Sequence, residues 1–246
     1  MDRTTPRHFN IPTFHLTKIL RNSADIIPLI QDLRAGTVAE YPHLRAASSD
    51  NETAGHNITC TPVVYHTISE NTDDDDDDDD EYSRAFVIQM LDEVLPQVAR
   101  MVEGRSPSDV AILYDNLRID VSALENLVEN LVKKNFKCNT QTIKDLELLK
   151  NKDCLIFDEW DNSPSFEFEV VVAVSVSLYP LERIPFTCHD VILHNMITRA
   201  RSHLVVVDPL GKYEYLKYPT SIPTMHFWER DEKTGKFVKC VDKSAP

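Results

Sequence analysis

Short apolar runs alternate with longer amphipathic segments through the middle of this chain, and this alternation restricts the fold more than any other feature. Four runs are apolar almost throughout, at residues 110–114, 154–158, 170–176 and 203–207. Apolar residues recur at helical spacing in the segments around them, over 85–102, 121–135, 143–149 and 188–201. Strands that are buried on both faces alternate with helices in this way in parallel sheets. The sequence therefore predicts an α/β fold over residues 84–208, with a doubly wound, mostly parallel sheet and helices on both faces.

The residues before this core predict a lead-in and one further strand. Residues 1–57 form an N-terminal lead-in, and apolar spacing over 13–36 predicts a helix within it. Pro28 is expected to divide this helix in two, because proline lacks the backbone N–H that a helix interior needs. Residues 58–68 are β-branched and apolar enough to predict a strand.

Two segments outside the core are polar or irregular. Residues 69–82 contain eight consecutive aspartates, which repel one another and predict a disordered acidic loop. The net charge is −14, but without the acids of residues 73–81 it is −5, so charge alone neither indicates nor excludes a nucleic-acid partner. Residues 209–246 form a C-terminal extension that resembles a tail, in which 213–218 could be an edge strand.

Composition also sets the expected environment of the chain. No apolar run approaches the roughly 18 residues that a membrane span needs, so we expect a soluble protein with no membrane partner. The five cysteines form no C-x-x-C pair, and the N-terminus lacks a signal-peptide pattern. These features predict reduced thiols, no metal site and an intracellular location, either cytoplasmic or nuclear.

The chain lacks the loops that usually cradle nucleotide phosphates. Neither G-x-x-x-x-G-K-[S/T] nor G-x-G-x-x-G occurs, and the whole sequence has only five glycines. Any nucleotide chemistry therefore needs a phosphate loop from elsewhere.

The segment 195–207 carries the most specific motif. It reads N-M-I-T-R-A-R followed by an apolar strand, so a predicted helix ends in Arg199 and Arg201. Arginines at a helix C-terminus are also favoured by the helix dipole, which leaves a purely structural role open. The segment resembles motif VI of the UvrD-like superfamily 1 helicases, which it matches at Thr198, Arg199, Ala200 and Arg201.

Two more segments resemble motifs of the same helicases, in the family's order. Residues 14–27 resemble motif IV, with Leu20 in place of the usual aromatic residue before Arg21. Residues 163–172 resemble motif V, which is matched at Glu167 and Phe168, although proline and serine replace its lysine and glycine. Together the segments span most of residues 13–208.

The resemblance implies the second RecA-like domain of a superfamily 1 helicase. Because its motifs are degenerate, the chain resembles animal Schlafen-type helicase-like proteins more than other members of the superfamily. In the family, the arginines matching Arg21 and Arg199 reach the γ-phosphate, and the glutamate matching Glu167 holds the nucleotide ribose. Arg201 is either a further nucleotide contact or a surface cation. A guanidinium suits the first role because it offers a planar, permanently charged fork to phosphate oxygens.

The resemblance also implies partners. ATP and Mg²⁺ are expected only in combination with a phosphate-loop RecA-like domain, which belongs either to the same gene product or to a separate chain. Single-stranded DNA or RNA is the expected nucleic-acid partner. We expect no ATP hydrolysis by this chain alone, and we expect the sequence to be a fragment of a larger product. The alternative is a catalytically inactive interaction or regulatory module that keeps the helicase-like fold.

Overall fold

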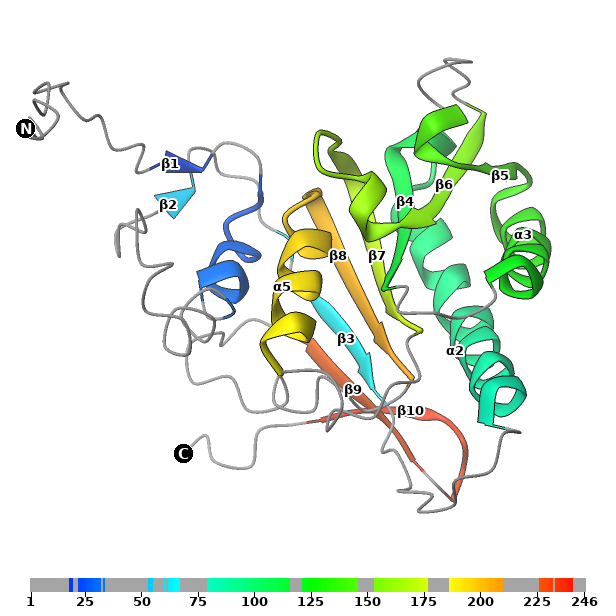
Figure 1. Cartoon of the computed structure of the whole chain (residues 1–246). Coiled ribbons are helices and arrows are strands. Elements are labelled where there is room, and N and C mark those ends of the chain that lie inside the picture. Colours follow the sequence, from blue (N-terminus) through cyan, green and yellow to red (C-terminus); the bar gives the residue numbers. More distant parts are fainter. Residues whose placement is uncertain are drawn as a thin grey trace, which may run out of the picture.

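An eight-stranded sheet runs through the centre of the molecule (Figure 1). The computed structural model describes residues 18–19, 22–31, 33, 53–54, 60, 62–66, 79–115, 121–145, 153–176, 186–209, 226–231 and 233–240. The strand order is β10-β9-β3-β8-β7-β4-β6-β5. Every neighbouring pair is parallel except β10 and β9. The predicted fold class is confirmed, and it is consistent with an α/β RecA-like fold.

The elements have the following bounds. The strands of the sheet are β3 (Val63–His66), β4 (Val110–Asp115), β5 (Asn139–Gln141), β6 (Cys154–Glu159), β7 (Phe168–Ser175), β8 (Ala200–Asp208), β9 (His226–Arg230) and β10 (Phe237–Lys239). The helices are α2 (Asp79–Met101), α3 (Val121–Phe136) and α5 (Phe186–Ile197), with the 3₁₀ turns η2 (Pro107–Asp109) and η3 (Trp160–Asn162). A separate two-stranded parallel sheet joins β1 (Lys18–Ile19) to β2 (Thr53–Ala54).

Helices cover both faces of the large sheet, which makes a core of two layers (Figure 1). On one face, α2 and α3 pack against side chains of the central strands such as Ile112, Val172 and Val205. On the other face, α5 and residues 26–33 pack against the alternate side chains, such as Leu113 and Val206. Successive strand residues point to opposite faces, so each apolar strand contributes to both layers.

The N-terminal segment differs from the predicted helix over 13–36. Lys18 and Ile19 form a strand, residues 24–26 form turns, and helix begins only at residue 27. Pro28 therefore lies in the first turn, where its missing N–H has no helical partner to lose, and it starts the helix instead of dividing it. Lys18 and Ile19 pair with residues 53 and 54 of β2, and apolar spacing within the segment does not show such a pairing.

The sheet also extends beyond the predicted core of 84–208. Strand β3 lies in its interior between β8 and β9, and it is shorter than the strand predicted over 58–68. Strands β9 and β10 complete one side of the sheet, so this part of the C-terminal extension is integral to the fold and is not a tail. Residues 213–218 lie outside the described residues.

Helix α2 begins at Asp79, inside the segment predicted as an acidic loop. Residues 69–78 of that segment lie outside the described residues. Among the residues that the structure describes, no helix is long and apolar enough to cross a membrane.

Candidate functional site

A buried asparagine joins the motif IV-like segment to the motif VI-like segment. The side-chain amide of Asn22 donates hydrogen bonds to the backbone carbonyl oxygens of Thr198 (3.2 Å) and Ala200 (2.6 Å). Only 3% of Asn22 is exposed. Its two acceptors flank Arg199, so the residue directly after Arg21 fixes the backbone on either side of Arg199. Arg21 itself lies outside the described residues.

The guanidinium of Arg199 in turn reaches the motif V-like segment. Its Nη1 donates to the carbonyl oxygen of Pro164 at 2.5 Å and lies 3.5 Å from that of Ser163. Its Nε donates to the carbonyl oxygen of Asn195 (3.2 Å), and its Nη2 to the hydroxyl of Thr198 (3.1 Å). Arg199 is 9% exposed, so a buried cation is held here by oxygen atoms. The bond to Asn195 also occupies one of the last carbonyls of α5.

A backbone hydrogen bond brings Glu167 beside this junction. The N–H of Phe168 donates to the carbonyl oxygen of Arg199 at 2.9 Å, at the amino ends of β7 and β8. Glu167 directly precedes Phe168, and its side chain is exposed. Three segments that are far apart in the sequence therefore meet at one edge of the sheet.

Arg201 has different partners from Arg199. Its guanidinium forms an ion pair with Glu169 at 3.2 Å, and Arg105 contacts the other oxygen of the same carboxylate at 3.1 Å. The Ser202 hydroxyl also donates to Glu169, either to its backbone carbonyl (2.8 Å) or to the carboxylate (3.1 Å). The structure thus brings Arg199 and Glu167 into adjacent segments but places Arg201 in a separate charged group.

Burial lowers the pKa of His203, which lies beside this charged group. The second cause is the positive charge of Arg105, while the charge of Glu169 acts in the opposite direction. The ring nitrogen Nδ1 of His203 lies 2.9 Å from the Ser202 hydroxyl oxygen. His203 is therefore mostly neutral at pH 7, because its pKa falls below the ordinary value of 6.5.

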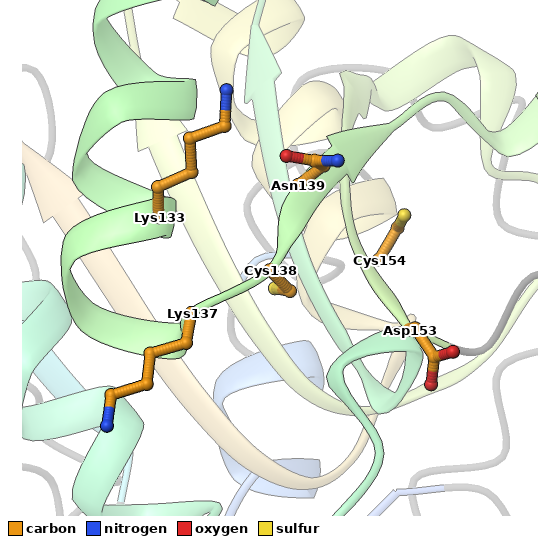
Figure 2. Close-up of a pocket in the computed structure, with 6 residues that line it drawn as sticks. All are labelled: Lys133, Lys137, Cys138, Asn139, Asp153 and Cys154. Carbon is orange, nitrogen blue, oxygen red and sulfur yellow. The ribbon is translucent and has the colours of Figure 1, made fainter.

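An open hollow of about 520 Å³ lies beside the amino ends of β5 and β6, towards the β5 edge of the sheet (Figure 2). Its lining residues are Lys133, Lys137, Cys138, Asn139, Asp153 and Cys154. The two lysine ammonium groups point away from each other, and so do the two thiols (Figure 2). These groups do not converge on one point, and no arginine of the junction is among the lining residues.

Sequence reasoning missed Asn22, Arg105 and Glu169 as parts of these groups. Asn22 and Glu169 both lie within segments that resemble helicase motifs, and that location could have marked them as candidate site residues. Arg105 had no such signal, because it lies in the turn between α2 and β4. Among the described residues, no group of three or more His, Cys, Asp or Glu side chains could hold a metal ion.

Comparison with known proteins gives a structural likeness. No protein-family model and no curated protein matches this chain. A solved structure described as the C-terminal domain of a possible DNA helicase from Lactobacillus plantarum WCFS1 is similar, with a TM-score of 0.46 and 13% sequence identity. The match covers 86% of this chain and 99% of that one.

Proposed function

We propose that this chain is the second RecA-like domain of a superfamily 1 helicase or NTPase of the UvrD-like type. In this role it supplies arginines and a nucleic-acid surface to an ATP site that a phosphate-loop domain completes. The meeting of three motif-like segments carries the proposal. Asn22 bonds to the backbone around Arg199, and the Arg199 guanidinium bonds to the backbone before β7. The motif-like segments lie far from one another in the sequence, and their meeting at one edge of the sheet supports the proposal.

The residues at this edge fit part of an ATP site. Arg199 would approach the γ-phosphate, the role that the resemblance also implies for Arg21, and Asn22 bonds to the backbone beside Arg199. Glu167 is exposed and would bind the ribose hydroxyls. ATP with its Mg²⁺ supplies the reactive phosphoryl group, and the partner domain supplies the backbone cradle that this sequence lacks.

Arg199 must change partners to act on a phosphate. Its guanidinium now bonds to backbone carbonyls and a hydroxyl, so a phosphate has to replace the Pro164 carbonyl as acceptor. Such an exchange is favourable, because a phosphate adds an opposite charge and can accept two parallel hydrogen bonds from the planar guanidinium fork. It would also release the segment before β7 and so couple nucleotide binding to the motif V-like residues.

The same contacts favour a second candidate function, a catalytically inactive interaction or regulatory module. If Arg199 keeps its carbonyl partners, it serves only to connect α5 to the segment before β7. The replacement of the motif V lysine and glycine by Pro164 and Ser165 favours this alternative too.

ATP turnover by the complete assembly distinguishes the two functions. The assembly is this chain together with the phosphate-loop domain encoded in the same transcript or bound as a separate chain. The helicase-domain proposal expects turnover that depends on Arg199, whereas the inactive module gives no turnover above background. Arg100→Gln is the control variant, since it also removes an arginine whose Nε donates to the carbonyl oxygen four residues earlier, but at an exposed position on α2.

A further inference from the structure

The charged group formed by Arg105, Glu169 and Arg201 lies at the amino edge of the sheet and is open to solvent. The carboxylate of Glu169 contacts Arg105 through one oxygen (3.1 Å) and Arg201 through the other (3.2 Å). The side chains of Arg105 and Arg201 are 39% and 55% exposed, and that of Glu169 is 27% exposed. We call these three residues the arginine pair site.

A bulge between β7 and β8 builds this site. Phe168 pairs with Ala200 and Val170 pairs with His203, so Glu169 alone lies opposite both Arg201 and Ser202. Such a bulge interrupts the regular alternation of side chains between the two faces of the sheet and redirects the side chains beside it. Here it directs Arg201 and Ser202 to the same carboxylate, which both contact.

A tight turn brings in the second arginine. Gly104 has a φ of 83°, a conformation that glycine adopts without strain, and the N–H of Arg105 donates to the carbonyl oxygen of Val102. The turn ends α2 and places Arg105 against Glu169 across 64 residues of sequence. Two fixed elements of the fold, a turn and a bulge, therefore position the two guanidinium groups.

The charges of the site do not cancel. Two guanidinium groups face one carboxylate, and His203 beside them is mostly neutral because burial lowers its pKa. The site thus carries a net charge of +1 on a chain whose total is −14. Each guanidinium has five N–H donors in a planar fork that matches phosphate oxygens. Because Glu169 contacts only one nitrogen of each arginine, other donors on these exposed side chains remain available to a ligand.

We propose that the arginine pair site binds a phosphate group of a nucleic-acid backbone, with Glu169 limiting its affinity. The assignment to nucleic acid rests on the proposed helicase-domain function. A free phosphate ion gains little from a single site of charge +1, whereas a polymer offers repeated phosphates and releases counterions when bound. The carboxylate occupies the arginines when no ligand is present and makes the contact weak and reversible.

Fluorescence anisotropy of a labelled oligothymidylate, titrated with the full chain at several salt concentrations, tests the site. Arg105→Gln and Arg201→Gln should each weaken binding about threefold to tenfold and reduce the salt slope by about 0.7, the value of one phosphate contact on a single strand. Glu169→Gln should strengthen binding, because it removes the competing charge. Surface ion pairs contribute little to folding, and circular dichroism checks that each variant is folded.

Lys134→Gln is the matched control. It also removes one exposed positive charge and one ion pair, that with Asp92 on the distant α2–α3 side. If the arginine variants bind the oligonucleotide like wild type, or no more weakly than Lys134→Gln, the proposal is overturned. If Glu169→Gln weakens binding, its stated role is overturned.

A calorimetric titration with inorganic phosphate separates the two sources of the ligand. One outcome is that the heat of phosphate binding depends on both arginines while oligonucleotide binding does not. The arginine pair site would then bind free phosphate, and its assignment to nucleic acid would be overturned. Neither result bears on ATP turnover by the assembly, so failure of this site and failure of the proposed function remain distinguishable.

Discussion

Replacing Asn22 with alanine should destabilise the fold strongly, because this amide connects the N-terminal segment to the start of β8. The substitution removes both hydrogen bonds to the carbonyl oxygens of Thr198 and Ala200. Each buried polar group left without its partner costs about 1–3 kcal/mol. With two carbonyl groups affected, the expected loss is about 2–6 kcal/mol, a large fraction of the roughly 5–15 kcal/mol that stabilises a typical domain.

Two further variants make this test specific. Asn22→Asp keeps the size of the side chain but turns a donor into an acceptor that faces two carbonyl oxygens, so it should destabilise at least as much as Asn22→Ala. Asn126→Ala is the control, since its amide also donates to a carbonyl oxygen, that of Ser122, but at an exposed position on α3. Its effect should stay within about 0.5 kcal/mol.

Urea unfolding followed by far-ultraviolet circular dichroism measures these differences. The slope of the unfolding free energy against urea should stay constant, which shows that the variants unfold from a similar native state. If Asn22→Ala unfolds within about 0.5 kcal/mol of wild type, the amide does not hold this junction and our reasoning is refuted.

Three further predictions concern other parts of the molecule. The isolated chain should not hydrolyse Mg²⁺-ATP, because it lacks a phosphate loop; turnover that survives purification and is abolished by a point substitution in this chain would contradict this. Deleting residues 73–78, which ends before α2 begins, should leave the melting temperature unchanged or slightly raised by relieving charge repulsion, and a fall of several degrees would show that these aspartates are bound in the folded state. Burial, assisted by the charge of Asp158, raises the pKa of Tyr114, so the unfolding free energy should fall as pH rises past about 10, where the unfolded tyrosine ionises first. Tyr114→Phe should lose this part of the pH dependence, and an unchanged profile would argue against it.

The central part of the fold could be predicted from the sequence because its signals are local. The apolar run of β4 and the apolar spacing of helices α2 and α3 can each be recognised within a short stretch of sequence. The position of β3 between β8 and β9 could not be predicted, because it depends on pairing with residues more than 130 positions away. Strand β9, His226–Arg230, has polar and charged residues and therefore gave no strand signal.

The site could be predicted only in its motif residues. Arg199 and Glu167 stand out by resemblance, but the partners of Arg199 are backbone carbonyls, which any residue carries and no sequence pattern marks. The separation of Arg201 from Arg199 follows from the bulge opposite Glu169, which is a property of strand register. Register depends on the whole sheet and is not visible in a hexamer of sequence.

Single-turnover ATP hydrolysis by the complete assembly, with Arg199→Ala and Arg199→Lys compared to wild type, tests the central claim most directly. The alanine variant should lower the hydrolysis rate by about 10³ to 10⁵, the range of an arginine finger, while nucleotide affinity changes far less. Lysine should restore little, because a single ammonium lacks the planar fork, and circular dichroism must show that both variants are folded. Near-normal hydrolysis in the folded Arg199→Ala assembly would contradict the account and identify Arg199 as a structural connection within an inactive module.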